Sequence, residues 1–404
     1  MLKAGQSLLL NNRRWHLRQV RSREARQLEL EAIGVSEAAQ GMTRRLTAIQ
    51  YGDELFIAKK RIQEYWYAHL EQDWRDDELG PILACRSATW LDLLDAHTRH
   101  PAAGELKNEF SWSYFRAARY RQCPRAYYYH YYAAWEGWRK DAPAPVQRAY
   151  LLKNLTDLSL WGGNLVHESI KFAVARLKAG QIVPETDLIE RMYSRARADF
   201  EDSRSGRYRR QPNQLTGFQE HYYRVGLPPS AWQAAWTRAE QLLRTFLQSA
   251  LYAHLRRQSP ATFLDVEELR AFTLAGAKVW VQLDLARREE DTIIVYDWKT
   301  GPVEEAEVRQ QLGIYGLYLR QAWPEPVKGV RGIVYALAED RLLEFELDEP
   351  ALQETQAAVE AGIAELRARL LEPRSNLAEL RRFPMIDDLA ECRRCQFREL
   401  CGRA

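Results

Sequence analysis

Two aspartates and a lysine, spaced along adjacent apolar stretches, are the residue types that a metal-dependent hydrolytic site requires. Residues 292–296 form a mostly β-branched apolar run that leads into Asp297, and Lys299 follows two positions later. This pattern predicts a buried strand. Alternate residues of a strand share a face, so Asp297 and Lys299 are expected on the same side. Both charges are costly to bury unless they have partners.

The preceding stretch supplies a second carboxylate. Residues 278–285 alternate in polarity and are predicted to form one strand that carries Asp284. If Glu290 and Asp291 form a two-residue hairpin loop, Asp284 lies directly opposite Asp297, where Cβ atoms are about 4.5–5.5 Å apart. A divalent cation between the two carboxylates would explain such a pair of like charges. The hairpin alone leaves open the alternative that each acid pairs with an arginine.

Elements around this hairpin carry further polar side chains. An amphipathic helix is predicted over residues 161–179, and it carries His167. Taken alone, a histidine on such a helix is more often a core residue than a metal ligand. A second helix, predicted over residues 303–322, places Gln311 and Tyr315 at i and i+4 on one face.

The order of these motifs resembles that of the PD-(D/E)xK nucleases, and within them the RecB-like group. The resemblance covers D-x(12)-D-x-K on a hairpin, a histidine on an upstream helix, and Q-x-x-x-Y on the helix that follows the lysine. It extends over residues 107–401. It implies an α/β fold: a restriction-endonuclease-like mixed sheet flanked by helices. It also implies cleavage of DNA, as an exonuclease acting on single strands or on DNA ends.

The resemblance assigns a role to each site residue. The implied ligands of Mg²⁺ or Mn²⁺ are His167, Asp284, Asp297 and the backbone carbonyl of Trp298. Lys299 is the implied catalytic group that orients the attacking water and stabilises developing charge. Gln311 and Tyr315 are expected to position the DNA strand or support the site.

Four of the five cysteines form a second candidate site: Cys123, Cys392, Cys395 and Cys401. Four thiolates hold either a [4Fe–4S] cluster or a Zn²⁺ ion, and their spacing alone does not separate the two. One cysteine before the nuclease core and three after it resemble the iron–sulfur branch of the family. That branch includes AddB-type helicase–nuclease subunits and RecB-like nucleases of CRISPR adaptation. Cys85 is expected to be a spare thiol.

The organisation of the chain is predicted in three regions. Residues 1–61 contain five short strand candidates and predict a small β domain, a barrel of SH3-like or OB-like kind. A helical linker is expected over residues 62–105. The nuclease region follows over 106–404, with a helical insertion at about 181–260 and a cysteine-containing tail. Within it, residues 111–138 are rich in aromatic and arginine residues, which either stack on bases or pack the core.

Composition restricts the remaining possibilities. The chain is 46% hydrophobic and 28% charged with a net charge of +3, which is typical of a folded protein. We found neither a long apolar membrane stretch nor a signal-peptide pattern, so a cytoplasmic protein is expected. No phosphate-loop motif is present, so any ATP-driven unwinding must come from a partner, such as a helicase or another repair or defence protein. The alternative is a non-catalytic DNA-binding or scaffold subunit.

Overall fold

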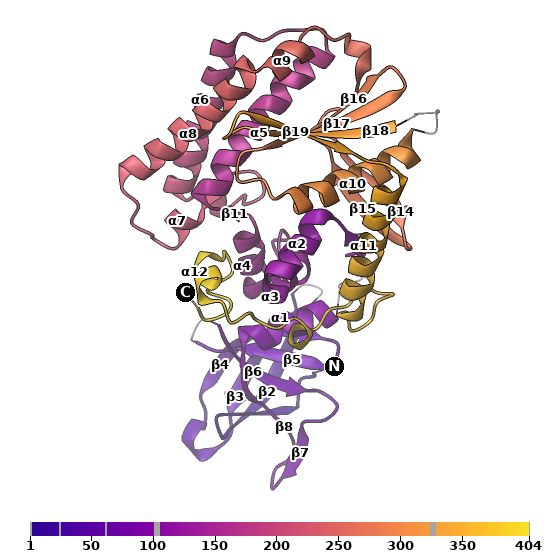
Figure 1. Cartoon of the computed structure of the whole chain (residues 1–404). Helices are drawn as coiled ribbons and strands as arrows, with labels where there is room; N and C mark the ends of the chain where they lie inside the picture. Colours follow the sequence, from indigo (N-terminus) through magenta and orange to yellow (C-terminus); the bar gives the residue numbers. More distant parts are fainter. Residues whose placement is uncertain (1, 24–25, 61–62, 101–105, 324–328, 404) are drawn as a thin grey trace. The chain divides into compact units, whose positions relative to one another are not determined.

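The computed structural model describes residues 2–23, 26–60, 63–100, 106–323 and 329–403, and they form two compact units (Figure 1). The first unit comprises Met1–Glu109, Cys123–Lys153 and Arg369–Ala404. The second comprises Phe110–Gln122 and Asn154–Ala368. In the described ranges, no helix has the length and apolar character needed to cross a membrane.

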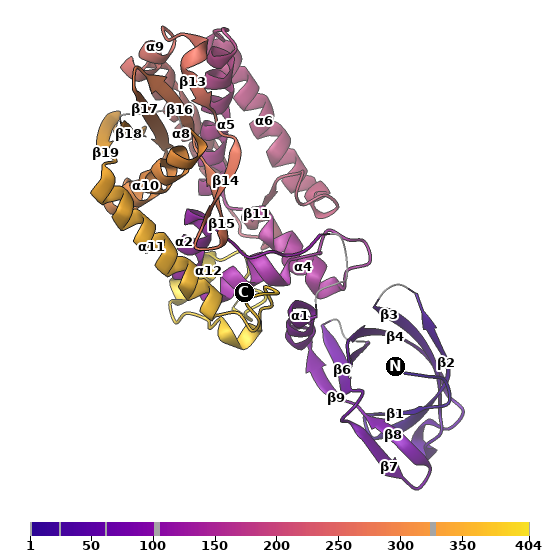
Figure 2. The same ribbon diagram turned by 90° about the vertical axis from the view of Figure 1, so that its right-hand side faces the viewer.

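A nine-stranded sheet makes up the N-terminal part of the first unit (Figure 2). Its strands are β1 (Ser7–Leu10), β2 (Arg13–Ser22), β3 (Gln27–Gly34), β4 (Thr43–Tyr51), β5 (Glu54–Ala58), β6 (Glu64–His69), β7 (Trp74–Asp77), β8 (Gly80–Ala84) and β9 (Arg86–Thr89). The order is β7-β8-β1-β2-β3-β4-β5-β6-β9. The five strands expected over residues 1–61 are present. Among the described residues no pairing joins β7 to β9, so the predicted barrel is not confirmed.

The helical linker expected over residues 62–105 is wrong for most of its length. Strands β6 to β9 occupy residues 64–89, and only α1 (Trp90–Arg99) is helical. Aromatic side chains favour the strand, because Tyr67 lies opposite Phe56 with their ring centroids 5.1 Å apart. The helix begins where Thr89 and Asp92 form a capping box. Residues 61, 62 and 105, at which the predicted regions begin or end, lie outside the described residues.

The rest of the first unit is helical and aromatic. It contains α3 (Pro124–Tyr128), the π-helix η2 (Tyr129–Ala133), α4 (Ala144–Lys153), η5 (Leu380–Arg382) and α12 (Leu389–Arg394), together with η1 (Glu37–Ala39) in the sheet region. The Tyr127 ring stacks on Phe383, and the Tyr129 ring contacts Phe397. Both tyrosines are buried. The core-packing interpretation of this aromatic segment is therefore the correct one for these two rings.

A five-stranded mixed sheet forms the centre of the second unit (Figure 1). Its strands, in spatial order, are β13 (Phe263–Asp265), β16 (Leu285–Glu289), β17 (Thr292–Lys299), β18 (Gly329–Ala336) and β19 (Arg341–Glu346). Strands β17 and β18 are parallel, and the other neighbours are antiparallel. Two small sheets accompany it: β10 (Ser111–Trp112), β15 (Ala277–Gln282) and β14 (Leu269–Leu274), and the pair β11 (Leu155–Thr156) and β12 (Gly217–Phe218).

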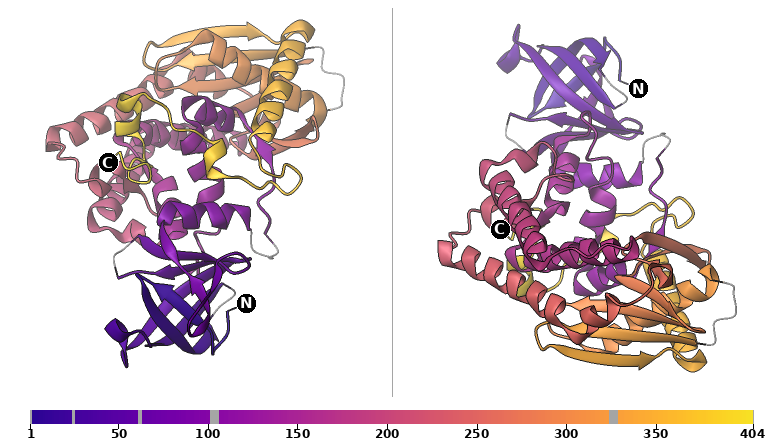
Figure 3. Two further views of the ribbon diagram at one scale, coloured as in Figure 1. Left: turned by 90° about the horizontal axis from the view of Figure 1, so that it is seen from below. Right: turned by 90° about the horizontal axis from the view of Figure 1, so that it is seen from above.

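Helices lie on both faces of the five-stranded sheet (Figure 1; Figure 3). The helices of the second unit are α2 (Tyr114–Gln122), α5 (Leu158–Lys178), α6 (Glu185–Ser205), α7 (Gln219–Tyr222), α8 (Pro229–Gln248), α9 (Ala250–Leu255), α10 (Glu305–Ala322) and α11 (Glu349–Ala368), with the short 3-10 helices η3 (Arg207–Arg209) and η4 (Pro260–Thr262). Tyr296 and Trp298 of β17 pack into one core with α5, α6 and α8. On the other face, Leu312 of α10 contacts the backbone at Gly332. The predicted mixed α/β architecture is thereby confirmed.

The stretch 278–285, expected to form one strand, is two strands in two sheets. Strand β15 ends at Gln282 and pairs with β14, whereas β16 begins at Leu285 and pairs with β17. Asp284 lies at the break between them. The chain therefore changes sheets just before the first predicted metal ligand.

Candidate active site

The β16–β17 hairpin has the register that the sequence predicted. Glu289 pairs with Thr292, and Leu285 pairs with Tyr296. One position beyond the ladder, Asp284 Oδ2 accepts a hydrogen bond from the backbone N–H of Trp298, with an N···O distance of 2.7 Å. This bond holds the Asp284 carboxylate beside the end of β17, next to Asp297.

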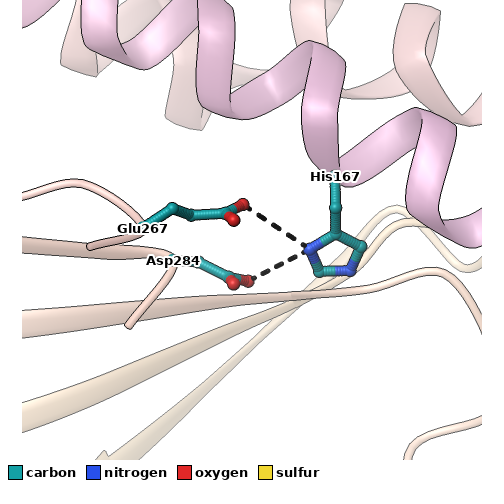
Figure 4. A group of neighbouring side chains, drawn as sticks. All are labelled: His167, Glu267 and Asp284. Atoms are coloured by element: carbon teal, nitrogen blue, oxygen red, sulfur yellow. Dashed lines mark ion pairs between the residues drawn. The ribbon is translucent and has the colours of Figure 1, made fainter. Parts of the chain in front are cut away.

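Helix α5 brings His167 to this carboxylate (Figure 4). The Asp157 side chain caps the helix by accepting from the Leu160 N–H, so α5 begins three residues earlier than predicted. Ile170, one turn after His167, is buried in the core and fixes that face of the helix against the sheet. His167 Nδ1 then lies 3.6 Å from Asp284 Oδ2.

Glu267 is a third member of this cluster that the sequence reasoning missed. Its Oε1 lies 4.0 Å from His167 Nδ1, and one ligand atom from each of His167, Glu267 and Asp284 lies within 4.8 Å of the others (Figure 4). The Glu267 N–H donates to the carbonyl of Leu283, which anchors this residue next to Asp284. A signal did exist: Glu267 lies two residues before β14, and its partner strand β15 ends two residues before Asp284.

Asp297 and Lys299 begin a chain of polar contacts that leads into α10. Lys299 Nζ lies 2.7 Å from Asp297 Oδ2 and donates to Gln311 Oε1, also at 2.7 Å. Gln311 Nε2 in turn donates to the Tyr315 hydroxyl at 2.7 Å. Asp297, Gln311 and Tyr315 are buried, whereas the Lys299 side chain is 25% exposed. The structure thus brings all of the predicted side chains of this site together.

The acids at this site create a strongly negative environment. Burial raises the pKa of Asp297 to about 6, with Lys299 opposing the shift and Asp284 adding to it. Burial likewise raises the pKa of Glu267 to about 7, and Asp284 again adds to the shift. Burial lowers the pKa of His167, but the charges of Asp284, Glu267 and Asp297 outweigh it and raise that pKa to about 9. Such a cluster favours a bound cation.

The donor set fits Mg²⁺ or Mn²⁺. Carboxylate oxygens suit both ions, and an imidazole is compatible with Mn²⁺ as well. Within the described ranges, Glu267 Oε1 is buried and accepts no hydrogen bond. A buried carboxylate oxygen without a donor has a desolvation cost that a metal ion would relieve. The part of the Trp298 carbonyl in binding the ion stays a prediction.

The four predicted cluster cysteines all belong to the first unit. Backbone N–H groups donate to two of the sulfurs: Ala126 N–H to Cys123, and Phe397 N–H to Cys395. Arg403 Nη1 donates to Cys392 Sγ at 2.8 Å. In the part of the chain that the structure describes, no three cysteine sulfurs lie within 4.8 Å of one another.

Cys401 and Cys85 differ in their surroundings. Burial raises the pKa of Cys401, and the neighbouring Cys123 and Cys392 add to that shift, whereas a hydrogen bond with Tyr129 opposes it. Cys85 instead packs against the core of the N-terminal sheet, where burial raises its pKa to about 12. The assignment of the other four cysteines to one cluster stays a prediction.

A mixed sheet with a carboxylate–lysine hairpin and a histidine-bearing helix defines a metal-dependent nuclease architecture. Residues 111–402 match the family model of the PD-(D/E)XK nuclease superfamily, and the chain belongs to that superfamily. No curated protein matches the chain. One similar solved structure is titled "Crystal structure of SSO0001". It shares 19% identity, covers 46% of this chain and 78% of its own, and has a TM-score of 0.24.

Proposed function

We propose that this protein is a metal-dependent DNA nuclease of RecB-like type. The observation that carries the proposal is the convergence of His167, Glu267 and Asp284 beside the Asp297–Lys299 ion pair. Superfamily members are typically nucleases, and this cluster provides the metal ligands and the cationic side chain that phosphodiester hydrolysis requires.

The residues of the chain have separable tasks in this mechanism. A bound Mg²⁺ or Mn²⁺ ion supplies Lewis acidity and lowers the pKa of water. Lys299 orients the attacking water through its remaining N–H group, and its positive charge stabilises the negative charge that develops on the phosphate oxygen. Gln311 fixes the Lys299 ammonium through its amide oxygen, and Tyr315 fixes Gln311. Gln311 and Tyr315 are therefore assigned the role of supporting Lys299, and not direct contact with DNA.

Aromatic rings on α2 support a preference for unpaired DNA. Tyr114 donates a hydrogen bond to Glu307 of α10. Burial raises the pKa of Tyr114, and the negative charges of Glu307 and, to a smaller extent, Asp297 raise it further, so the ring lies near the active-site acids. The adjacent Phe115 ring is 65% exposed, and its centroid lies 5.8 Å from that of Tyr114. Exposed rings beside a cleavage site stack unpaired bases without regard to sequence. An end or a single strand is the substrate that such rings favour.

The proposed biological setting follows from the resemblance to RecB-like nucleases. It is the cytoplasm, in repair or recombination of DNA, or in CRISPR adaptation or another antiviral defence. A helicase is the proposed partner, because the sequence contains no phosphate-loop motif.

A cleavage assay tests the proposal. Purified protein is incubated with end-labelled single- and double-stranded DNA in Mg²⁺, in Mn²⁺ and in EDTA. We expect metal-dependent cleavage, faster on single strands, and the product ladder gives the polarity. Binding without cleavage in either metal would favour the alternative of a non-catalytic scaffold subunit.

We further propose that Cys123, Cys392, Cys395 and Cys401 hold a [4Fe–4S] cluster with a structural role. Hydrogen bonds from backbone N–H groups to Cys123 and Cys395 are of the kind that stabilises cluster sulfurs. A tetrahedral zinc ion would hold its sulfurs only about 3.8 Å apart, given a Zn–S distance of about 2.3 Å. A larger cluster suits sulfurs that are more widely separated. Zinc stays the alternative.

Loss of any one of these cysteines is expected to destabilise the protein. Cys123→Ala, or alanine at any of the other three, should lower the melting temperature and reduce the brown absorption near roughly 400 nm of anaerobically purified protein. Cys85→Ala is the control, and this variant should keep the wild-type melting temperature and absorption. Metal analysis and thermal unfolding provide the measurements. Colourless protein with one zinc per chain would show that zinc, and not an iron–sulfur cluster, occupies the site. Unchanged melting temperatures in the alanine variants would contradict a structural metal.

A further inference from the structure

Helix α8 exposes a face composed of small, polar and cationic side chains. The exposed residues recur every three to four positions and so follow one side of the helix: Ser230, Gln233, Ala234, Thr237, Arg238 and Gln241. Together they line a shallow hollow that is open to solvent. From Ser230 to Gln241 this face extends over about 16 Å. We call it the α8 polar face.

The chemistry of the α8 polar face fits a phosphate backbone. Hydroxyl, amide and guanidinium groups are the side chains that commonly contact phosphate oxygens. The single acid of α8, Glu240, does not line the hollow and pairs with Arg244. Arg244 also pairs with Glu185. One arginine of the helix is thus neutralised by acids, while Arg238 remains the cation of the α8 polar face.

Arg238 connects the α8 polar face to the active site. Its Nη2 atom lies 3.4 Å from the carbonyl oxygen of Thr300, the residue after Lys299. Helix α5 also approaches Thr300 closely, because a Cβ atom added at Gly163 would lie 3.0 Å from Thr300 Oγ1. Gly163 is one helical turn before His167. The guanidinium therefore lies at the end of β17, at the residue that follows Lys299 in the sequence.

We propose that the α8 polar face binds the sugar–phosphate backbone of a single-stranded nucleic acid next to the cleaved bond, and that Arg238 binds a phosphate adjacent to the scissile one. The proposal rests on the proposed nuclease function and adds the path of the strand. Binding there is independent of base sequence, because the contacts are to the backbone. Arg238 is a positioning residue and takes no part in the bond-breaking step.

Salt dependence of binding provides the test. A short fluorescein-labelled single-stranded DNA is titrated in EDTA, so that no cleavage occurs, at salt concentrations between about 50 and 200 mM. Each neutralised phosphate contributes about 0.7 to the slope of log K against log salt for a single strand. Arg238→Ala should lower this slope by about 0.7, whereas Arg238→Lys should retain most of it. With Mg²⁺ present, Arg238→Ala should raise KM more than it lowers kcat.

Arg244→Ala is the matched control, since Arg244 is on the same helix but does not line the hollow, and its charge is paired with Glu185 and Glu240. It should retain the wild-type slope, and melting temperatures should confirm that both alanine variants fold. An unchanged slope in Arg238→Ala, or an equal loss in Arg244→Ala, would overturn the inference even if the protein cleaves DNA. A slope that depends on Arg238 in a protein that cleaves nothing would support the strand path and reject the nuclease function.

Discussion

Lys299→Ala is expected to lower kcat for DNA cleavage by about 10²–10³-fold, the cost of removing one group that stabilises transition-state charge. The Lys299 ammonium is held in place by Asp297 and by Gln311, each at 2.7 Å, so it is oriented before substrate arrives. A side chain that acts on developing charge contributes little to ground-state binding. KM should therefore change much less than kcat.

Two controls separate this effect from a loss of folding or of metal. Lys278→Ala removes an exposed lysine that lies over the Trp280 ring in the same unit, and it should cleave at the wild-type rate. Removing Lys299 also removes a cation that opposes the raised pKa of Asp297. Activity should therefore be measured at saturating Mg²⁺. Wild-type kcat in Lys299→Ala under these conditions would reject its catalytic assignment.

The hairpin shows how much of the site could be predicted from sequence. The β16–β17 register follows from a two-residue loop at Glu290 and Asp291, a local feature that the sequence displays. The position of Asp284 opposite the end of β17 could be predicted. The break between β15 and β16, at which Asp284 lies, could not. Alternation of polarity continues through residues 278–285, so nothing in the pattern marks the point where the chain changes sheets.

Glu267 was missed because its position depends on non-local pairing. The hydrogen bond from its N–H to Leu283 O places it beside Asp284, 17 residues later (284 − 267) in the sequence. That register depends on β14 pairing with β15, which begins with Leu269 opposite Gln282. Without the pairing, Glu267 is one member of an acidic pair with Glu268 at the start of a strand. A motif fixed by spacing can be predicted more readily than a ligand fixed by sheet pairing.

The region after residue 61 shows a different limit of sequence reasoning. Residues 64–69 contain acidic and aromatic residues without clear alternation, so their periodicity does not identify a strand. Their strand conformation depends on β5, where Ile57 lies opposite Trp66 and Phe56 opposite Tyr67. Tertiary pairing thus determines their conformation where local pattern is ambiguous. By contrast, the helix predicted over residues 303–322 has a strong local signal and is present as α10 (Glu305–Ala322).

The second large effect expected is stabilisation by divalent metal that increases with pH. In the metal-free protein the pKa values of Asp297, Glu267 and His167 are raised to about 6, about 7 and about 9. Their ordinary values are 3.8, 4.5 and 6.5. A group whose pKa is higher in the folded than in the unfolded state stabilises the fold fully at a pH below its unfolded-state pKa. This contribution is lost as the pH rises through its folded-state pKa. The metal-free protein should therefore lose stability from about pH 4 to about pH 9.

Metal binding requires the deprotonated forms of the same groups, so its affinity rises over the same pH range. At a hundredfold excess over its dissociation constant, a ligand adds about 2.7 kcal/mol to the free energy of unfolding. That corresponds to roughly 5–10 °C in Tm for a domain of this size. Thermal unfolding with and without Mg²⁺ should show a larger Tm increase near pH 8.5 than near pH 6, because protons compete less at the higher pH.

Neighbouring glutamates provide a matched pair of variants for this measurement. Glu267→Gln removes a carboxylate of the cluster and should reduce both the Mg²⁺-dependent Tm increase and its dependence on pH. Glu268→Gln changes the adjacent acid, which is exposed and pairs with Arg270, and should leave both unchanged. If Mg²⁺ raised Tm equally at both pH values, proton competition at this cluster would be rejected. If it raised Tm at neither, the cluster would not be a metal site, because a ligand that binds only the folded state must stabilise it.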